Sequence, residues 1–194
     1  MIGSANRLLL CLAGTALVTA CASPPAHFYT LTSTLEEPAG RTSAVTVAVG
    51  PASLPEAVNR PQMVLLTGPN QVTLDEFNRW AAPMQGEIQR VVMRNLTRLL
   101  ETPGIFRYPQ GPITDPDFRT QIEVLCFESA PGQEALLDVL WTVRGKHEKD
   151  GKHGRTTVRE PLRDNSISTL VAAHSLALGT LSRDLADAIL SLER

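Results

Sequence analysis

Two stretches with helical spacing of apolar residues limit most strongly what this chain can fold into. The first follows Pro83 and has apolar residues at steps of three and four: Met84, Ile88, Val91, Val92, Leu96, Leu99 and Leu100. The second starts at Thr169 and continues with Leu170, Val171, His174, Leu178, Leu181, Leu185, Ile189 and Leu192. A stripe of this kind covers one side of a helix and is buried against another layer. We therefore expect two long helices.

The rest of the chain favours β-strands. Aromatic and β-branched residues alternate with polar residues in short segments, and Pro, Gly and Asn separate these segments. We expect strands over residues 28–32, 45–49, 63–66, 71–74, 105–108, 118–127, 135–143 and 155–159. Gly50 and Pro51 are expected to end the second of these strands. In the strand over residues 118–127, Cys126 is expected on the same face as Val124, because side chains alternate along a strand.

These elements together predict one α+β domain. Strands, a helix, more strands and a second helix follow one another, and no internal repeat divides the chain. The segments Thr67–Asn70 and Asp150-Gly151 are typical of hairpin turns, so the strands that flank them should pair antiparallel. We expect a mixed, mostly antiparallel sheet with two long helices packed on one face.

The N-terminus has the features of a secretory signal peptide. Arg7 precedes a short apolar run, and the small residues Thr19 and Ala20 come directly before Cys21. The run is shorter than the roughly 20 apolar residues that span a bilayer as a helix. Residues 17–21 resemble the bacterial lipobox, which implies diacylglycerol on the Cys21 thiol, cleavage before it and acylation of the new amino terminus. The alternative is an ordinary secretory signal, with Cys21 as an incidental residue.

This interpretation divides the chain into three parts. Residues 1–20 are expected to be a lipoprotein signal peptide, residues 21–27 a tether and residues 28–194 the folded domain. Pro24 and Pro25 favour an extended, solvated backbone in the tether. The tether would hold the domain clear of the lipid surface.

Composition and motifs argue against several functional classes. The net charge is −2, whereas binding of nucleic acid demands a strongly basic face. With Cys11 removed and Cys21 lipidated, Cys126 is the remaining thiol, so the mature chain cannot form an intramolecular disulfide. The sequence has no glycine-rich phosphate loop, nucleophile elbow or zinc motif. It therefore predicts neither a nucleic-acid partner nor a cofactor.

Few residues suggest chemistry. Asp115 and Asp117 are loop carboxylates without a third ligand nearby in the sequence, so we expect no metal there. His174 and Ser175 are neighbours on a helix and point to different sides, which argues against a catalytic dyad. His174 lies on the apolar stripe and is expected to be a hydrogen-bonded core residue. We predict no catalytic residue and a protein that is not an enzyme; a periplasmic hydrolase is the weakest alternative.

The segment from Gly50 to Pro83 is a candidate interface. It is rich in proline and contains Arg60-Pro61 and, near its end, Trp80. Trp and Arg are favoured at the energetic centres of protein interfaces. We therefore single out four residues as a candidate partner interface: Arg60, Pro61, Trp80 and Pro83. A rigid crossover that covers a sheet edge explains the same residues equally well.

Several motifs, in this order, resemble the PqiC-like (YmbA-like) lipoproteins, also called ABC-type transport auxiliary lipoproteins. They are Tyr29-Thr30-Leu31, Val49-Gly50-Pro51 with Leu54-Pro55, Arg60-Pro61-Gln62-Met63-Val64, Phe77-Asn78-Arg79-Trp80-Ala81-Ala82-Pro83-Met84 and Leu170-Val171-Ala172-Ala173-His174-Ser175 with Leu181-Ser182. The resemblance covers nearly the whole mature chain. The chain departs from the pattern at Ala57-Val58-Asn59, where an aromatic residue and an Asp are usual, and at Ala82, where an acidic residue is usual. A partner contact through those positions would differ here.

The resemblance implies a role in transport without catalysis. It implies a lipid-anchored protein on the periplasmic face of the outer membrane, and the lack of Asp after Cys21, where Ala22 and Ser23 follow, implies the same location. Its partners would be an MCE-domain tunnel protein and an inner-membrane transporter component of an intermembrane lipid transport system that supports envelope integrity. It would dock the tunnel as one copy or as a homo-oligomeric ring. The alternative is a lipoprotein chaperone that itself carries a lipid in an apolar pocket.

Overall fold

The computed structural model describes residues 24–35, 44–111, 115–147 and 151–193, so the signal peptide and Cys21 lie outside the described residues. Eight strands and two helices form in the described part. The strands are β1 (His27–Tyr29), β2 (Val47–Ser53), β3 (Gln62–Gly68), β4 (Gln71–Trp80), β5 (Ile105–Arg107), β6 (Phe118–Ala130), β7 (Glu134–Gly145) and β8 (Lys152–Pro161). The helices are α2 (Met84–Leu99) and α3 (Ile167–Leu192).

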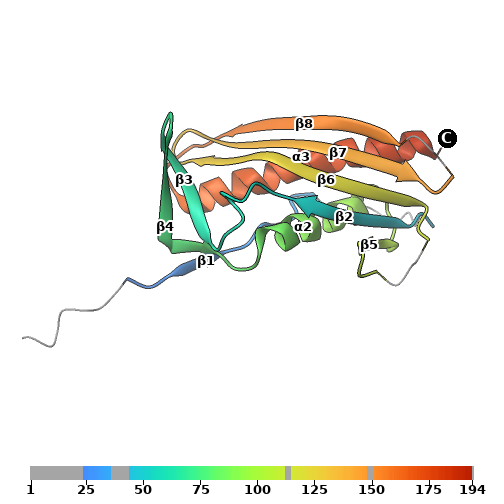
Figure 1. The fold of residues 1–194 in the computed structure, drawn as a ribbon, viewed down its shortest axis with the longest axis horizontal. Helices are drawn as coiled ribbons and strands as arrows, with labels where there is room; N and C mark the ends of the chain where they lie inside the picture. The colour runs from blue at the N-terminus through green and yellow to red at the C-terminus, as the bar shows by residue number, and fades with distance from the viewer. Residues whose placement is uncertain (1–23, 36–43, 112–114, 148–150, 194) are drawn as a thin grey trace, which may run out of the picture.

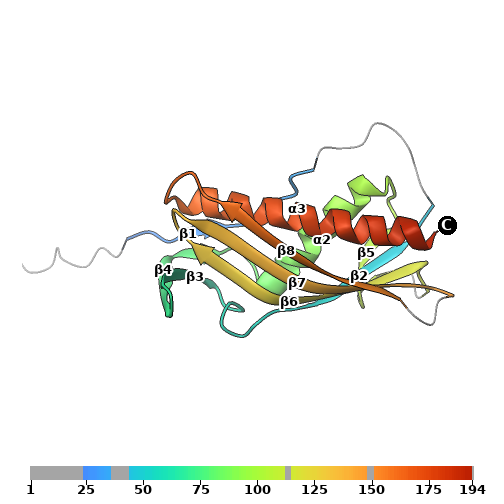
Figure 2. The same ribbon diagram turned by 90° about the horizontal axis from the view of Figure 1, so that it is seen from above.

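The strands form one mixed sheet. Its order is β1-β4-β3-β6-β2-β5, and β7 and β8 extend it from the other side of β6. The long pairings β6/β7, β7/β8 and β3/β4 are antiparallel, whereas β1/β4, β2/β5, β2/β6 and β3/β6 are parallel. Both helices lie on one face of this sheet (Figures 1 and 2). The expected α+β fold is confirmed.

The two predicted helical stripes are confirmed as the sides that the helices bury. In α2 the stripe from Met84 to Leu96 is buried, and in α3 the stripe from Leu170 to Ile189 is buried. The helices also meet through a polar pair, since the Asn95 Nδ2 donates to Ser182 Oγ at 3.0 Å and both residues are buried. A buried hydrogen bond of this kind favours one alignment of the two helices, because a slip would take this acceptor from the buried amide of Asn95.

Several strands continue past the ends that their sequences predict, and β2 and β4 do so most clearly. β2 runs through Gly50 and Pro51, so the expectation that they end the strand is wrong. The pairing of β2 with β6 shifts register between Val49 and Ala52, and Gly50 has a φ of 111° there. A Cβ at this position would lie 2.1 Å from the Nε2 of Gln89. Only glycine fits both the backbone angle and the space. β4 likewise extends beyond residue 74, to Trp80.

The expected alternation along β6 is also wrong at its end. The register of β6 against β7 shifts between Val124 and Cys126, which leaves Leu125 as an extra residue. Such a bulge reverses the phase of the side chains that follow it. As a result Phe127 is buried in the core, whereas Cys126 is only half-buried.

The segment of residues 30–35, here called the N-terminal strap, lies against both helices. Its Leu31 is completely buried. The Thr32 amide donates to Ser175 Oγ of α3 at 3.1 Å, and the Ser33 hydroxyl donates to Asn95 Oδ1 of α2 at 2.6 Å. The strap directly follows β1, which pairs with β4. It therefore ties the N-terminal end of the domain to the helical layer.

The strap also contacts the buried carboxylate of Glu87. This carboxylate accepts hydrogen bonds from the Leu31 amide at 3.1 Å and the Thr30 hydroxyl at 2.5 Å. It also accepts from Arg90 Nε at 3.1 Å and Nη2 at 2.7 Å, and Arg90 donates back to the Leu31 carbonyl at 2.6 Å. Burial raises the pKa of Glu87, but the hydrogen bonds from Arg90 and Thr30 outweigh it, so the pKa lies below its ordinary value.

Substitution of Glu87→Gln should lower the free energy of unfolding by about 1–3 kcal/mol at pH 7, because it removes a charge-assisted network from a buried site. Since folding lowers the pKa of Glu87, its contribution is complete above the unfolded value of about 4.3 and is lost as the pH falls through the folded value. The difference between wild type and variant should therefore shrink below about pH 4. Urea unfolding at a series of pH values measures it.

The matched control is Glu76→Gln on the exposed side of β4, which should change the unfolding free energy by less than about 0.5 kcal/mol. A Glu87→Gln variant as stable as wild type at pH 7 would show that the strap is not held by this carboxylate.

Candidate functional site

The four residues that the sequence singles out line one pocket. Its volume is about 370 Å³, and it is lined by Asn59, Arg60, Pro61, Trp80, Ala81, Ala82, Pro83 and Met84. It lies where β3 begins, β4 ends and α2 begins. The Trp80 amide donates to the Pro61 carbonyl at 2.8 Å, and the Ala81 amide donates to the Tyr29 carbonyl at 2.8 Å. These bonds join β1, β3 and β4 around it. We call it the Arg60–Trp80 pocket.

Trp80 forms the floor of this pocket, and the other three residues lie on its rim. Only 6% of Trp80 is exposed, whereas Arg60, Pro61 and Pro83 are exposed. The ring of Trp80 meets Phe127 edge-on, with ring centroids 6.1 Å apart and an interplanar angle of 76°. A partner could therefore reach little of the indole, and Trp80 would act by shaping the apolar base against which a side chain packs.

His174 completes the stack under the pocket. Its ring lies flat on Phe127, with centroids 3.8 Å apart, and its Nε2 shares a hydrogen bond of 2.9 Å with Ser129 Oγ. The prediction of a core histidine is confirmed, although Nδ1 has no hydrogen-bond partner among the described residues. Burial lowers the pKa of His174 to about 3, so the ring is neutral at physiological pH.

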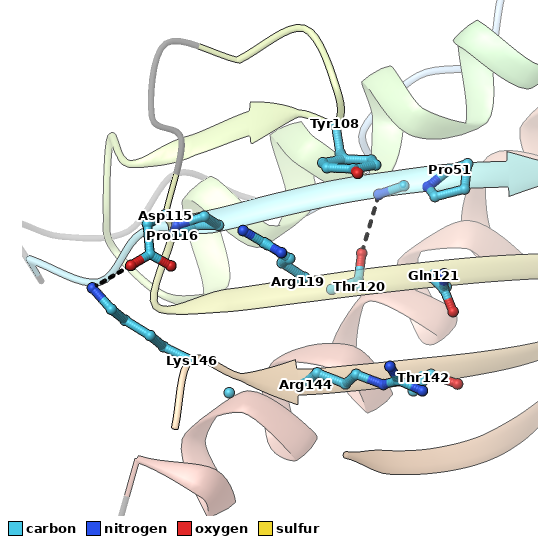
Figure 3. Close-up of a pocket in the computed structure, with 12 residues that line it drawn as sticks. Pro51, Tyr108, Asp115, Pro116, Arg119, Thr120, Gln121, Thr142, Arg144 and Lys146 are labelled. Atoms are coloured by element: carbon cyan, nitrogen blue, oxygen red, sulfur yellow. Dashed lines mark hydrogen bonds and ion pairs between the residues drawn. The ribbon is translucent and has the colours of Figure 1, made fainter. Parts of the chain in front are cut away.

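A second pocket, which the sequence did not suggest, lies near the start of β6 (Figure 3). Its volume is about 340 Å³. Arg119 of β6 and Arg144 of β7 line it and are register partners in the sheet. Lys146 also lines it and forms an ion pair of 2.8 Å with Asp115. Cross-strand register brings these cations together, and register cannot be read from the local sequence.

The loop carboxylates have structural partners. Asp117 accepts hydrogen bonds from the Thr46 amide at 2.9 Å and the Thr46 hydroxyl at 2.6 Å, which ties the start of β6 to the segment before β2. The hydrogen bond from Lys146 lowers the pKa of Asp115. Within the described residues, no group of three His, Cys, Asp or Glu side chains is arranged to hold a metal ion.

His174 and Ser175 point to different partners. The Ser175 hydroxyl donates to the Val171 carbonyl at 2.9 Å and accepts from the strap, whereas His174 pairs with Ser129 of the sheet. The two side chains therefore serve separate structural contacts.

In the part of the chain that the structure covers, neither helix is long and apolar enough to cross a membrane.

A family model described as an ABC-type transport auxiliary lipoprotein component matches residues 29–186. The chain belongs to this family. The match begins in β1 and ends within α3, so it includes the N-terminal strap, the Arg60–Trp80 pocket and the stack beneath it. The family thus agrees with the resemblance seen in the sequence, and it describes a transport component rather than a known class of enzyme.

Solved structures share the fold of this auxiliary lipoprotein. One is an uncharacterized protein with a TM-score of 0.71 and 15% identity, a match that covers 86% of this chain and 99% of that chain. Another is a Xanthomonas campestris protein of the family DUF330, with a TM-score of 0.67 and 19% identity, covering 83% and 93% of the two chains. At these identities the likeness concerns the fold alone. A comparison with curated proteins found no match.

Buried His174, in the stack under the pocket, should make the unfolding free energy depend on pH. An unfolded histidine titrates near pH 6.5, whereas folded His174 stays neutral down to about pH 3. The unfolded chain therefore binds one more proton in this range, and wild type should lose about 2 kcal/mol of unfolding free energy between pH 7.5 and pH 5 from this residue.

Urea unfolding at the two pH values measures this loss. His174→Phe removes the titrating group and should be less stable than wild type at pH 7.5, because Ser129 loses its partner, but its stability should fall less at pH 5. The control His153→Asn, on exposed β8, should keep the wild-type loss. An unchanged pH dependence in His174→Phe would contradict the assignment.

Proposed function

We propose that this chain is an outer-membrane lipoprotein that docks an MCE-domain tunnel protein for an ABC-type intermembrane lipid transport system. The observation that carries the proposal is the N-terminal strap. It begins nine residues after Cys21, the proposed site of lipidation, and is hydrogen-bonded to both helices. A load on the lipid anchor would therefore pass into the core of the domain. This is what a protein that links a membrane to a transport machine requires.

The Arg60–Trp80 pocket is the proposed contact with the tunnel protein. Its rim is stiffened by Pro61 and Pro83, so little backbone freedom is lost when a partner binds. The exposed Ala81 and Ala82 leave space for a partner's apolar side chain above Trp80, and Arg60 offers hydrogen bonds to a carbonyl or carboxylate. The inner-membrane component would act through the tunnel protein, and copies of this chain would surround the tunnel as a ring.

The alternative of a lipid-carrying chaperone has weaker support. The space between the sheet and the helices is filled by side chains such as Leu96, Phe127 and Leu178. The Arg60–Trp80 pocket is lined mainly by apolar atoms but is open at the surface, and the pocket near the start of β6 is lined by mixed polar and apolar residues. Lipid extraction from the purified domain tests this alternative, and a stoichiometric bound lipid would favour it.

The lipid anchor is tested by Cys21→Ala. The variant should no longer be labelled by palmitate, should retain its signal peptide and should no longer be recovered in the outer-membrane fraction. Radiolabelling and membrane fractionation measure these changes. The control Cys126→Ala should behave as wild type, since this thiol lies in β6 of the folded domain. Labelling that survives in Cys21→Ala but not in Cys126→Ala would overturn the assignment.

The docking pocket is tested by Ala82→Arg. A long charged side chain at this exposed position should block the pocket and reduce crosslinking to the MCE-domain protein at least tenfold, while circular dichroism stays unchanged. The matched control is Ala172→Arg, which changes an exposed alanine of α3 outside the pocket. Equal crosslinking of both variants and wild type would show that the partner binds elsewhere.

A further inference from the structure

The β3–β4 hairpin has one buried and one exposed apolar face. Met63 and Leu65 pack against the core, and Leu65 is in register with Ser129 of β6. On the opposite face, the register places Val64 across from Leu74, and Leu66 across from Val72. Partners that face each other across an antiparallel pair lie on the same side of the sheet. These four residues therefore form one surface, which we call the hairpin outer face.

The β4 side of the hairpin outer face is exposed, whereas Val64 and Leu66 of β3 are half-buried. Val72 is 58% exposed and Leu74 is 40% exposed. Phe28, on the neighbouring strand β1, is 65% exposed and is in register with Arg79 near the base of the hairpin. Exposed apolar side chains that lie close together mark a surface that contacts a membrane or another protein.

The distal part of the hairpin lacks charge, whereas its base carries Asp75, Glu76 and Arg79 on β4. The segment from Pro61 to Leu74 contains no Asp, Glu, Lys or Arg, although 20% of the chain is charged. Exposed hairpins and edge strands usually carry charges that keep them in water and prevent association. The uncharged distal part of this hairpin, with its apolar face, can in contrast enter the interface of a bilayer without the cost of burying charge.

The position of the proposed anchor indicates that a membrane covers this surface. Cys21 precedes the first residue of β1 by six residues, and an extended chain spans at most about 3.6 Å per residue. The lipid would therefore hold β1 within about 20 Å of the membrane surface. Figure 1 shows that the chain enters the domain through β1 at the end where the β3–β4 hairpin projects. The membrane is thus the apolar surface nearest to the hairpin.

We propose that the hairpin outer face inserts into the surface of the bilayer that anchors Cys21, as a second, noncovalent membrane contact. The proposal rests on the lipidation in the proposed function. Together, the lipid and the hairpin would fix the orientation of the domain, because two separated contacts remove the rotation that a tether alone permits. The Arg60–Trp80 pocket, at the base of the same hairpin, would then be held beside the membrane.

The test supplies the anchor artificially, so its outcome does not depend on lipidation in the cell. The mature chain carries Cys126→Ser and an N-terminal hexahistidine in place of Cys21. It is bound to vesicles of phosphatidylethanolamine and phosphatidylglycerol that contain a nickel-chelating lipid. An environment-sensitive fluorophore is attached through Val72→Cys, Leu74→Cys or the control Leu176→Cys. Leu176 is a matched control because it is 49% exposed and lies on α3.

Labels at positions 72 and 74 should shift to shorter emission wavelengths, brighten at least twofold on vesicles and be quenched by spin-labelled lipid, while the label at position 176 should not change. Equal responses at all three positions, or none at positions 72 and 74, would overturn the proposal. If the label at position 72 shifts to shorter wavelengths without vesicles, and light scattering shows a doubling of mass, the proposal is overturned and the face is assigned to a second copy of the chain.

The rate of release from the vesicles provides an independent test. The double variant Val72→Asp/Leu74→Asp should be released from the nickel-chelating vesicles by imidazole at least fivefold faster than wild type, and Leu176→Asp should match wild type. Both positions of the double variant are exposed, so circular dichroism should show an intact fold. Equal release rates for wild type and the double variant would overturn the proposal even if the fluorophores respond.

Discussion

The buried carboxylate of Glu87 is the interaction on which the arrangement of this molecule depends. It joins the N-terminal strap to α2, and α2 in turn packs on α3 and on β2. If the strap left this position, Leu31 would leave the core, and Ser175 and Asn95 would each lose a partner. Because the strap lies between the N-terminus and the helices, the contacts that stabilise the fold would also transmit any force from the proposed anchor.

Local patterns in the sequence predicted the elements, but not where the pairing of strands shifts. The helical stripes and the alternating strands are short-range signals. The structure confirms both helices and a strand in each expected segment, but the first strand ends at Tyr29 rather than residue 32 and the alternation along β6 fails after Val124. The irregularity of β2 at Gly50 depends on how β2 meets β6, and the bulge at Leu125 depends on how β6 meets β7. Pairing partners of this kind are set by tertiary contacts, so periodicity alone could not reveal them.

The same limit applies to the candidate site. Composition singled out Arg60, Pro61, Trp80 and Pro83, and the structure brings all four into one pocket. Composition alone could not distinguish the rim of the pocket from its floor. Trp80 is buried against Phe127, and Phe127 points inward only because of the bulge in β6. The contact of Thr30 with Glu87 was also hidden, since no sequence pattern links residues so far apart. The hairpin outer face was missed because both faces of β3 are apolar.

The N-terminal strap, the Arg60–Trp80 pocket and Phe28 of β1 meet at the base of the β3–β4 hairpin. The Tyr29 carbonyl accepts from Ala81 in the pocket, Phe28 is in register with Arg79, and the strap begins at Thr30. A shift of the anchored segment would therefore displace the pocket rim as well. The proposed tether over residues 21–27 alone would let this pocket face any direction, so a tunnel protein would have to search for it. A rigid base that contacts the membrane would present the pocket in one orientation and so reduce the entropy lost on docking.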